Sequence, residues 1–275
     1  MYSGTTFRTK SGLVIGVHQK IDRIARRHIA AKMPKRYFFP TATEILHFEG
    51  LNGPDGIKRK SPAKDEPWHY IDPENPEDRQ IVDMINDHIY NMAEALRGEN
   101  RERAAFEAAW MAHAIVDGLT PAHHYPLDEK IEELWGMPKE ARITIRDKNI
   151  IRGKNRRDTL SKNWQYWDAK GVFTNHFMFE WGVATGIAPL RFEESAPSME
   201  EFQRIADEGF EATYFEIVRK IADMKMYEEF SRLGWTRQLG KETRDVLVPE
   251  LIKAVTLGWY AAIVMAEKRH ERSDH

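Results

Sequence analysis

The chain has 275 residues, and its 41 Lys and Arg against 43 Asp and Glu give a formal net charge of −2. A charge this close to zero argues against a nucleic-acid coat protein or a polybasic membrane anchor. With 41% hydrophobic and 31% charged residues and no Cys, the composition is that of a globular chain without disulfides or thiolate metal ligands.

No targeting or membrane-spanning segment is predicted. The first ten residues are polar and lack the apolar core of a signal peptide. The longest apolar stretch, near Leu257–Ala266, is shorter than the roughly 20 residues that a membrane helix needs. The sequence as written therefore predicts a cytoplasmic protein, which is compatible with transient contact at a membrane surface.

Apolar residues recur at helical spacing along most of the chain, and no sustained alternation of β-branched residues predicts a sheet. Gly98 closes one expected helix, and Ser198 followed by Glu201 has the capping-box pattern of a helix start. The expected helices are Leu13–Met33, Glu77–Gly98, Arg101–Gly118, Gly171–Ile187, Ser198–Leu233 and Lys241–His270.

Two regions lack this periodicity and are expected to be non-helical. Phe48–Pro73 is dense in Gly, Pro and Asp, and Trp135–Asp158 is rich in Lys and Arg. Neither has the composition of a linker, because the helices on both sides are suited to a shared core. We therefore predict one compact all-α domain over residues 1–275, with a basic insertion at about residues 135–158.

The informative polar residues are histidines on apolar helices. His113 and Asp117 are four residues apart, and His176 and Glu180 repeat that spacing, so each pair shares a helix face and can bind one metal. About two such pairs are expected by chance in a chain with 11 His and 43 acidic residues, so the spacing alone is a weak signal. The neighbouring residues are a stronger signal than the spacing. Glu180 lies between two aromatic residues, where burial of a carboxylate without a compensating cation costs free energy.

These pairs belong to a longer ordered pattern. The run His113-x3-Asp117-x3-Pro121-x-His123 resembles the signature of the zinc-dependent phospholipase C and single-strand-specific zinc nuclease superfamily. Pro67-Trp68-His69-Tyr70-Ile71-Asp72-Pro73 resembles the histidine loop of that family, and Gly53-Pro54-Asp55 precedes it at a fitting distance. With His18 in the first helix and His176-x3-Glu180 after the signature, eight candidate ligands follow the family's order.

The resemblance implies the all-α fold of that superfamily and a cluster of two or three zinc ions. One ion would be bound by Asp55, His69, His113 and Asp117, a second by His123, His176 and Glu180, and a third by His18 with Asp117 as a bridge. Imidazole and carboxylate without thiolate is the donor set of hydrolytic zinc sites, although it also accepts Fe, Mn, Co or Ni. The implied activity is phospholipase C-like hydrolysis of a phosphate ester, with Asp55 as a general base as well as a ligand.

The sequence departs from the family at three points. The family's third zinc takes the amine and carbonyl of a mature N-terminal residue, often Trp, whereas this chain begins at Met1 without a visible signal. We therefore expect the amine to be absent from the site and the third ion to bind more weakly. Gly56 and Glu66 stand where phosphatidylcholine-cleaving members carry aromatic residues, so a choline pocket of that kind is not expected. The interval from His123 to His176 is also longer than in the compact bacterial phospholipases of the family, and it holds the basic insertion.

Two features leave the substrate open. The basic stretch from Arg142 to Arg157 is either a rim that attracts a phosphate-bearing substrate or, more commonly, a solvated segment balanced by acidic neighbours. Trp164, Tyr166 and Trp167 could stack bases, but such clusters more often pack helices. The alternatives to a phospholipase C-like hydrolase are a nuclease or 3′-nucleotidase on the same scaffold and a metal-binding interaction protein without catalysis.

Overall fold

The computed structural model describes residues 1–3, 16–30, 32–33, 38–62, 69–168 and 171–273. It is 73% helical and has no strand in the described ranges, which confirms the predicted all-α fold. The α-helices are α1 (Val17–Ala30), α2 (Ala42–His47), α3 (Pro54–Lys60), α4 (Gln80–Arg97), α5 (Arg101–Gly118), α6 (Leu127–Trp135), α7 (Ile145–Asn149), α8 (Arg156–Trp167), α9 (Val172–Ile187), α10 (Met199–Glu208), α11 (Glu211–Ala222), α12 (Met226–Leu233), α13 (Arg237–Glu242) and α14 (Val248–Ser273).

The main core forms around α14, which packs against α1, α4, α5 and α10. Helix α5 is rich in alanine and buried on most of its faces, because small side chains allow α4 and α14 to approach it closely. Trp259 of α14 is fully buried there, and its indole N–H donates a hydrogen bond of 2.9 Å to the carbonyl of Ala108. This packing fixes α5, which carries His113 and Asp117, at the centre of the molecule.

A π-helical turn at Thr243–Leu247 joins α13 to α14, and the combined helix Arg237–Lys268 is long and apolar enough to cross a membrane by length and composition. However, 72% of the apolar 18-residue stretch of this helix is buried inside the structure. Core helices satisfy the same criteria, and its packing against α1, α4 and α5 accounts for its apolar surface.

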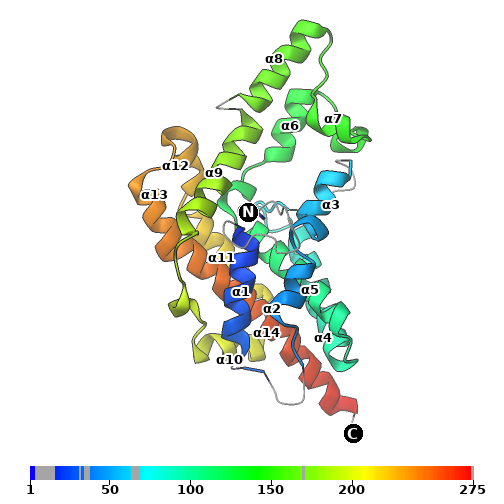
Figure 1. Cartoon of the computed structure of the whole chain (residues 1–275), viewed down its shortest axis with the longest axis vertical. Coiled ribbons are helices and arrows are strands. Elements are labelled where there is room, and N and C mark those ends of the chain that lie inside the picture. Colours follow the sequence, from blue (N-terminus) through cyan, green and yellow to red (C-terminus); the bar gives the residue numbers. More distant parts are fainter. Residues whose placement is uncertain (4–15, 31, 34–37, 63–68, 169–170, 274–275) are drawn as a thin grey trace.

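Helices α6, α7 and α8 extend to one end of the long axis in Figure 1, away from α14. They have an apolar cluster of their own, made by Ile131, Trp135, Ile151 and Tyr166. The prediction of a non-helical segment over Trp135–Asp158 is therefore wrong in part, since this range includes α7 and the first turn of α8. We refer to α6, α7 and α8 with their connections as the outer lobe.

The helix boundaries show which local sequence signals were sufficient to predict where a helix begins or ends. Helix α5 has the predicted bounds, and the capping box of Ser198 starts α10 as expected. The single helix predicted over Ser198–Leu233 is instead three helices, broken by positive backbone φ angles of 85° at Gly209 and 51° at Lys225. Phe48–Pro73 was also expected to be non-helical, but Pro54 opens α3, as its fixed φ favours.

Two glycines of α9 allow a matched test of this packing. A Cβ atom added at Gly182 would lie 1.8 Å from Nε1 of Trp235, whereas one added at Gly186 would have no neighbour within 4 Å. We expect Gly182→Ala to lower the free energy of unfolding by about 1–3 kcal/mol through displacement of the indole. Gly186→Ala should leave it unchanged or raise it by up to about 1 kcal/mol, because Ala is the better helix former. Urea denaturation measures both, and equal effects would contradict the packing of Trp235 on α9.

Candidate metal centre

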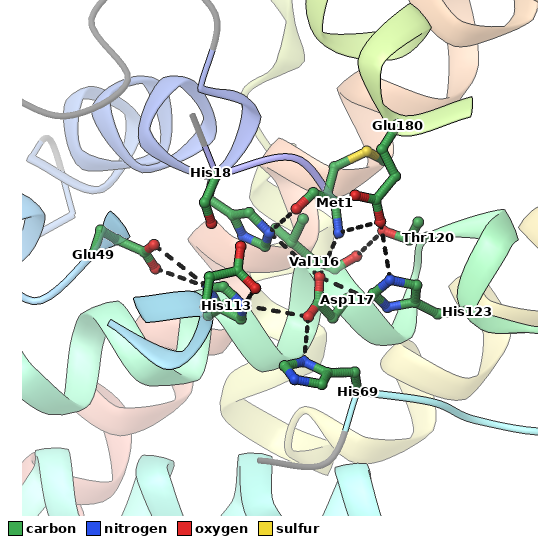
Figure 2. A network of polar contacts seen from close by, with 12 residues as sticks. Met1, His18, Glu49, His69, His113, Val116, Asp117, Thr120, His123 and Glu180 are labelled. Atoms are coloured by element: carbon green, nitrogen blue, oxygen red, sulfur yellow. Dashed lines mark hydrogen bonds and ion pairs between the residues drawn. The ribbon is translucent and has the colours of Figure 1, made fainter. Parts of the chain in front are cut away.

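Several elements distant in sequence bring the candidate ligands to one end of α5. His18 comes from α1, while His176 and Glu180 come from α9. Helix α5 ends at Gly118, and Pro121 then opens a 3₁₀ turn that returns His123 toward Asp117. Figure 2 shows the side chains of His18, His123 and Glu180 around the Asp117 carboxylate.

The first buried group that could hold a metal ion consists of His18, His113 and Asp117. Nε2 of His18 lies 3.3 Å from Oδ1 of Asp117, and Nε2 of His113 lies 3.3 Å from Oδ2 of the same carboxylate. The two imidazole rings are stacked, with centroids 3.9 Å apart and an interplanar angle of 4°. Asp117 therefore presents one oxygen to each ring.

The second buried group that could hold a metal ion consists of His123, His176 and Glu180. Oε1 of Glu180 lies 3.0 Å from Nε2 of His123 and 3.1 Å from Nε2 of His176. This is the set that the resemblance implied for one ion. The i, i+4 spacing on α9 thus does what the sequence predicts and places both side chains on one face.

Met1 lies between the two groups, as Figure 2 shows. Its amino group is 2.6 Å from Oδ1 of Asp117 and 3.1 Å from Oε1 of Glu180, and its carbonyl oxygen is 2.9 Å from Nε2 of His18. The expectation that the amine would be absent from the site is wrong. Burial alone would lower the pKa of this amino group, but the carboxylates of Asp117 and Glu180 raise it to about 10.

His69 and Asp55 also contact the cluster, but the structure does not place them in the two compact groups. Nδ1 of His69 lies 2.7 Å from Oδ2 of Asp117, and Oδ1 of Asp55 lies 3.8 Å from Nε2 of His113. The first compact group therefore combines His113 and Asp117 with His18, whereas the resemblance implied that His69 and Asp55 would complete the ligand set of that ion. Pro67 and Trp68 of the histidine loop, and Glu66 beside it, lie outside the described residues.

The donor atoms fit a metal by two criteria. Ligands held about 2.1 Å from a tetrahedral ion lie about 3.4 Å from each other, close to the 3.0–3.3 Å separations within the two groups. In addition, Nε2 of His113, which is one of these donor atoms, is buried and has no hydrogen-bond partner in the described part of the chain. Nε2 of His69, next to the first group, is in the same condition. A buried polar atom without a partner is costly unless something binds nearby.

Ionised carboxylates beside neutral imidazoles are the protonation state of a metal-ligand set, and the pKa shifts of Asp117, Glu180 and His123 are in that direction. Burial opposes ionisation of Asp117, but the Met1 amine and the imidazoles of His123 and His113 hold its pKa well below the usual range. The same amine and His176 lower the pKa of Glu180. Burial also lowers the pKa of His123 to about 3. His113 is the exception: despite burial, Asp117 and Glu49 raise its pKa.

Two buried carboxylates behind the cluster were not among the predicted site residues. Glu49, which is 2% exposed, has its oxygens 3.3 and 3.4 Å from Nδ1 of His113. A carboxylate behind an imidazole orients the ring and makes its other nitrogen a stronger ligand. Asp22 is buried one turn after His18 on α1, and neither of its oxygens has a hydrogen-bond partner in the described residues. The His18-x3-Asp22 spacing could have identified Asp22, whereas no local signal marks Glu49.

Comparison with protein-family models and with curated proteins finds no match to this chain, so the functional argument rests on the geometry of the cluster.

We expect purified protein reconstituted with Zn²⁺ to hold about two ions per chain, one for each buried group. His113→Ala and His176→Ala should each remove about one ion, because each removes one of three donors from a different group. His47→Ala, at an exposed position of α2, is the matched control and should leave the content unchanged. Mass-spectrometric metal analysis measures all three, and well under one ion in the wild type would contradict the assignment.

Metal removal should also destabilise the fold, because it leaves the buried carboxylates of both groups with less compensating charge. A chelator in excess should lower the melting temperature of the wild type by about 10 °C. The double variant His113→Ala/His176→Ala should melt at nearly the same temperature with and without chelator. A wild-type melting curve that does not move once the metal is shown to be gone would contradict this account.

The Met1 amine can be tested separately from the side chains. A short extension before Met1 converts the amine to an amide, which cannot bind a metal through nitrogen in the same way. We expect the extension to weaken zinc binding at least tenfold at the weakest site, while the same extension after His275 has no effect. Competition with a chromogenic chelator measures the difference, and equal affinities would show that the amine is not a ligand.

Proposed function

We propose that this chain is a metal-dependent hydrolase of phosphate esters, related to the zinc-dependent phospholipases C and zinc nucleases that its ordered ligand pattern resembles. The observation that carries the proposal is the position of the ligands in a cavity. A cavity of about 600 Å³ is lined by all three residues of the second group, His123, His176 and Glu180, and by Asp117 of the first group. This volume is suited to a small-molecule substrate or to the reactive part of a larger one.

A divalent ion held by these groups would supply Lewis acidity toward a phosphoryl oxygen and toward water. Asp55 lies at the edge of the cluster with its side chain 23% exposed, and it also lines the cavity. Its carboxylate is therefore positioned to orient an attacking water and to accept its proton at Oδ1 or Oδ2. Lys58 and Arg59, on the same helix and in the same cavity, supply positive charge for the phosphate oxygens.

The backbone packing at Gly56 indicates whether the substrate carries a choline group. A Cβ atom added at Gly56 would lie 2.1 Å from the carbonyl oxygen of Leu51, so this position has no room for an aromatic side chain. We therefore favour phosphate esters without a choline group. This choice depends on the backbone packing of α3 against the turn at Gly50–Asn52.

Nuclease or 3′-nucleotidase activity is the second candidate, and one observation favours it. Trp167 is 45% exposed and lines the cavity together with Phe173. The expected role of this aromatic cluster in helix packing fits Tyr166, which is buried in the outer lobe, but not Trp164, which is 66% exposed. An exposed ring in the lining of the same cavity can stack a base.

Replacement of Asp55 by Asn should separate catalysis from metal binding. The amide keeps the size of the side chain but cannot accept a proton, so we expect hydrolysis of bis(p-nitrophenyl) phosphate to fall by at least 10²-fold with little loss of metal. His113→Ala should lose activity and about one metal ion, and His47→Ala should lose neither. A panel with p-nitrophenylphosphorylcholine and 3′-nucleotides then ranks the substrate classes. Wild-type protein with full metal content and no activity on any member would contradict the proposed function.

A further inference from the structure

The cavity over the metal centre has a cationic side chain in its outer wall. Arg142, from the connection between α6 and α7, lines the cavity although it is only 3% exposed. Its guanidinium lies 5.6 Å from the ring centroid of Trp135, in a cation–π contact. Arg142 thus contacts the apolar cluster of the outer lobe through Trp135 and lines the same cavity as the metal-binding residues.

The protein supplies little compensation for this buried charge. Among the described residues, Arg142 has one ion pair, which is with Glu132, whose Oε1 lies 3.8 Å from Nη2, beyond hydrogen-bond distance. That same oxygen accepts a hydrogen bond of 2.7 Å from the backbone N–H of Lys139. Nε and Nη2 of Arg142 are buried and have no hydrogen-bond partner in the described residues. A buried guanidinium in this condition is destabilising unless an anion approaches it.

Arg142 differs in this respect from the rest of the basic stretch. Arg146, Arg152, Lys154 and Arg157 are exposed, and none of them lines the cavity. The interpretation of the stretch as a solvated segment therefore fits these residues. Among the basic side chains of the stretch that the structure describes, the interpretation as a substrate-attracting rim fits Arg142 alone. A distinction of this kind depends on tertiary packing, and the sequence gives no sign of it.

We propose that Arg142 is a specificity-determining residue that binds a second anionic group of the substrate. The preferred substrate would be a phosphate ester whose scissile phosphate lies at the metal centre while a carboxylate or second phosphate, carried on the same molecule, reaches the outer wall. The lining of the cavity also includes Tyr166 and Phe173, so an apolar or aromatic spacer suits it. The proposal rests on the proposed function for the scissile phosphate and adds the second charge.

A set of phosphonates tests this without turnover, because their C–P bond is not hydrolysed. Alkylphosphonates of two to six carbons are compared with ω-carboxyalkylphosphonates and α,ω-bisphosphonates of the same lengths, which covers the unknown span and distinguishes the two sources of the second charge. Calorimetric titration of zinc-loaded protein gives the affinities. We expect at least one doubly anionic ligand to bind about tenfold more tightly than the alkylphosphonate of its own length.

Three variants identify the residue responsible. Arg142→Met, which keeps the contact with Trp135 but removes the charge, should abolish the tenfold preference. Arg142→Lys should retain part of it, and Arg146→Gln, at an exposed position of the same lobe, should retain all of it. Without ligand, Arg142→Met should melt at or above the wild-type temperature, because it removes an uncompensated buried charge. A strongly lowered melting temperature would instead indicate a structural cation and overturn the proposal.

The remaining outcomes separate this proposal from the function on which it rests. If alkylphosphonates bind with equal affinity to wild type and Arg142→Met, and a second charge brings no gain at any length, the phosphate site stands and the role of Arg142 is refuted. If no phosphonate binds protein shown to hold its metal, the phosphate-ester function fails and the role of Arg142 fails with it.

Discussion

The carboxylate of Asp117 is the point on which the site depends. It is buried on α5 and lies within 3.3 Å of the Met1 amine and of ring nitrogens from His18, His69 and His113. Such a carboxylate is tolerated in a protein interior only when positive charge or hydrogen-bond donors surround it. The packing of α1, α5 and the histidine loop around one side chain is thus an electrostatic requirement as well as a hydrophobic one.

Local pattern was enough to predict part of this arrangement. The pairs His113/Asp117 and His176/Glu180 share faces because the helical repeat places residues four apart side by side, and the Ala-rich α5 has the predicted bounds. The structure also brings His18 next to the pair His113/Asp117, and His123 next to the pair His176/Glu180. The breaks at Gly209 and Lys225 were missed because apolar periodicity continues across them.

Other features depend on which surfaces pack together, and periodicity carries no information about that. Glu49 reaches His113 across 64 positions of sequence, and the Met1 amine reaches Asp117 across 116. The presence of His18 in the first compact group, in place of the expected His69 and Asp55, also depends on tertiary packing. Each was decided by how α1 and the turn before α3 lie against α5.

The lining of the cavity carries charges of both signs. Asp55 of α3, Asp117 of α5 and Glu180 of α9 supply carboxylates, whereas Lys58 and Arg59 of α3 and Arg142 of the outer lobe supply positive charge. The ion pair that the described residues give Arg142 is with Glu132 and not with a carboxylate of the lining. A ligand with a phosphate and a second anion would meet positive charge at the metal-binding residues, once metal ions occupy them, and again at Arg142. The apolar cluster of the outer lobe is connected to the rest of the fold through Tyr125, which packs against the main core as well, and through Tyr70, whose ring centroid lies 5.3 Å from that of His123. The proposed binding of a second anion at Arg142 therefore depends on a part of the fold that differs from the helix carrying Asp117 but contacts the metal-binding residues.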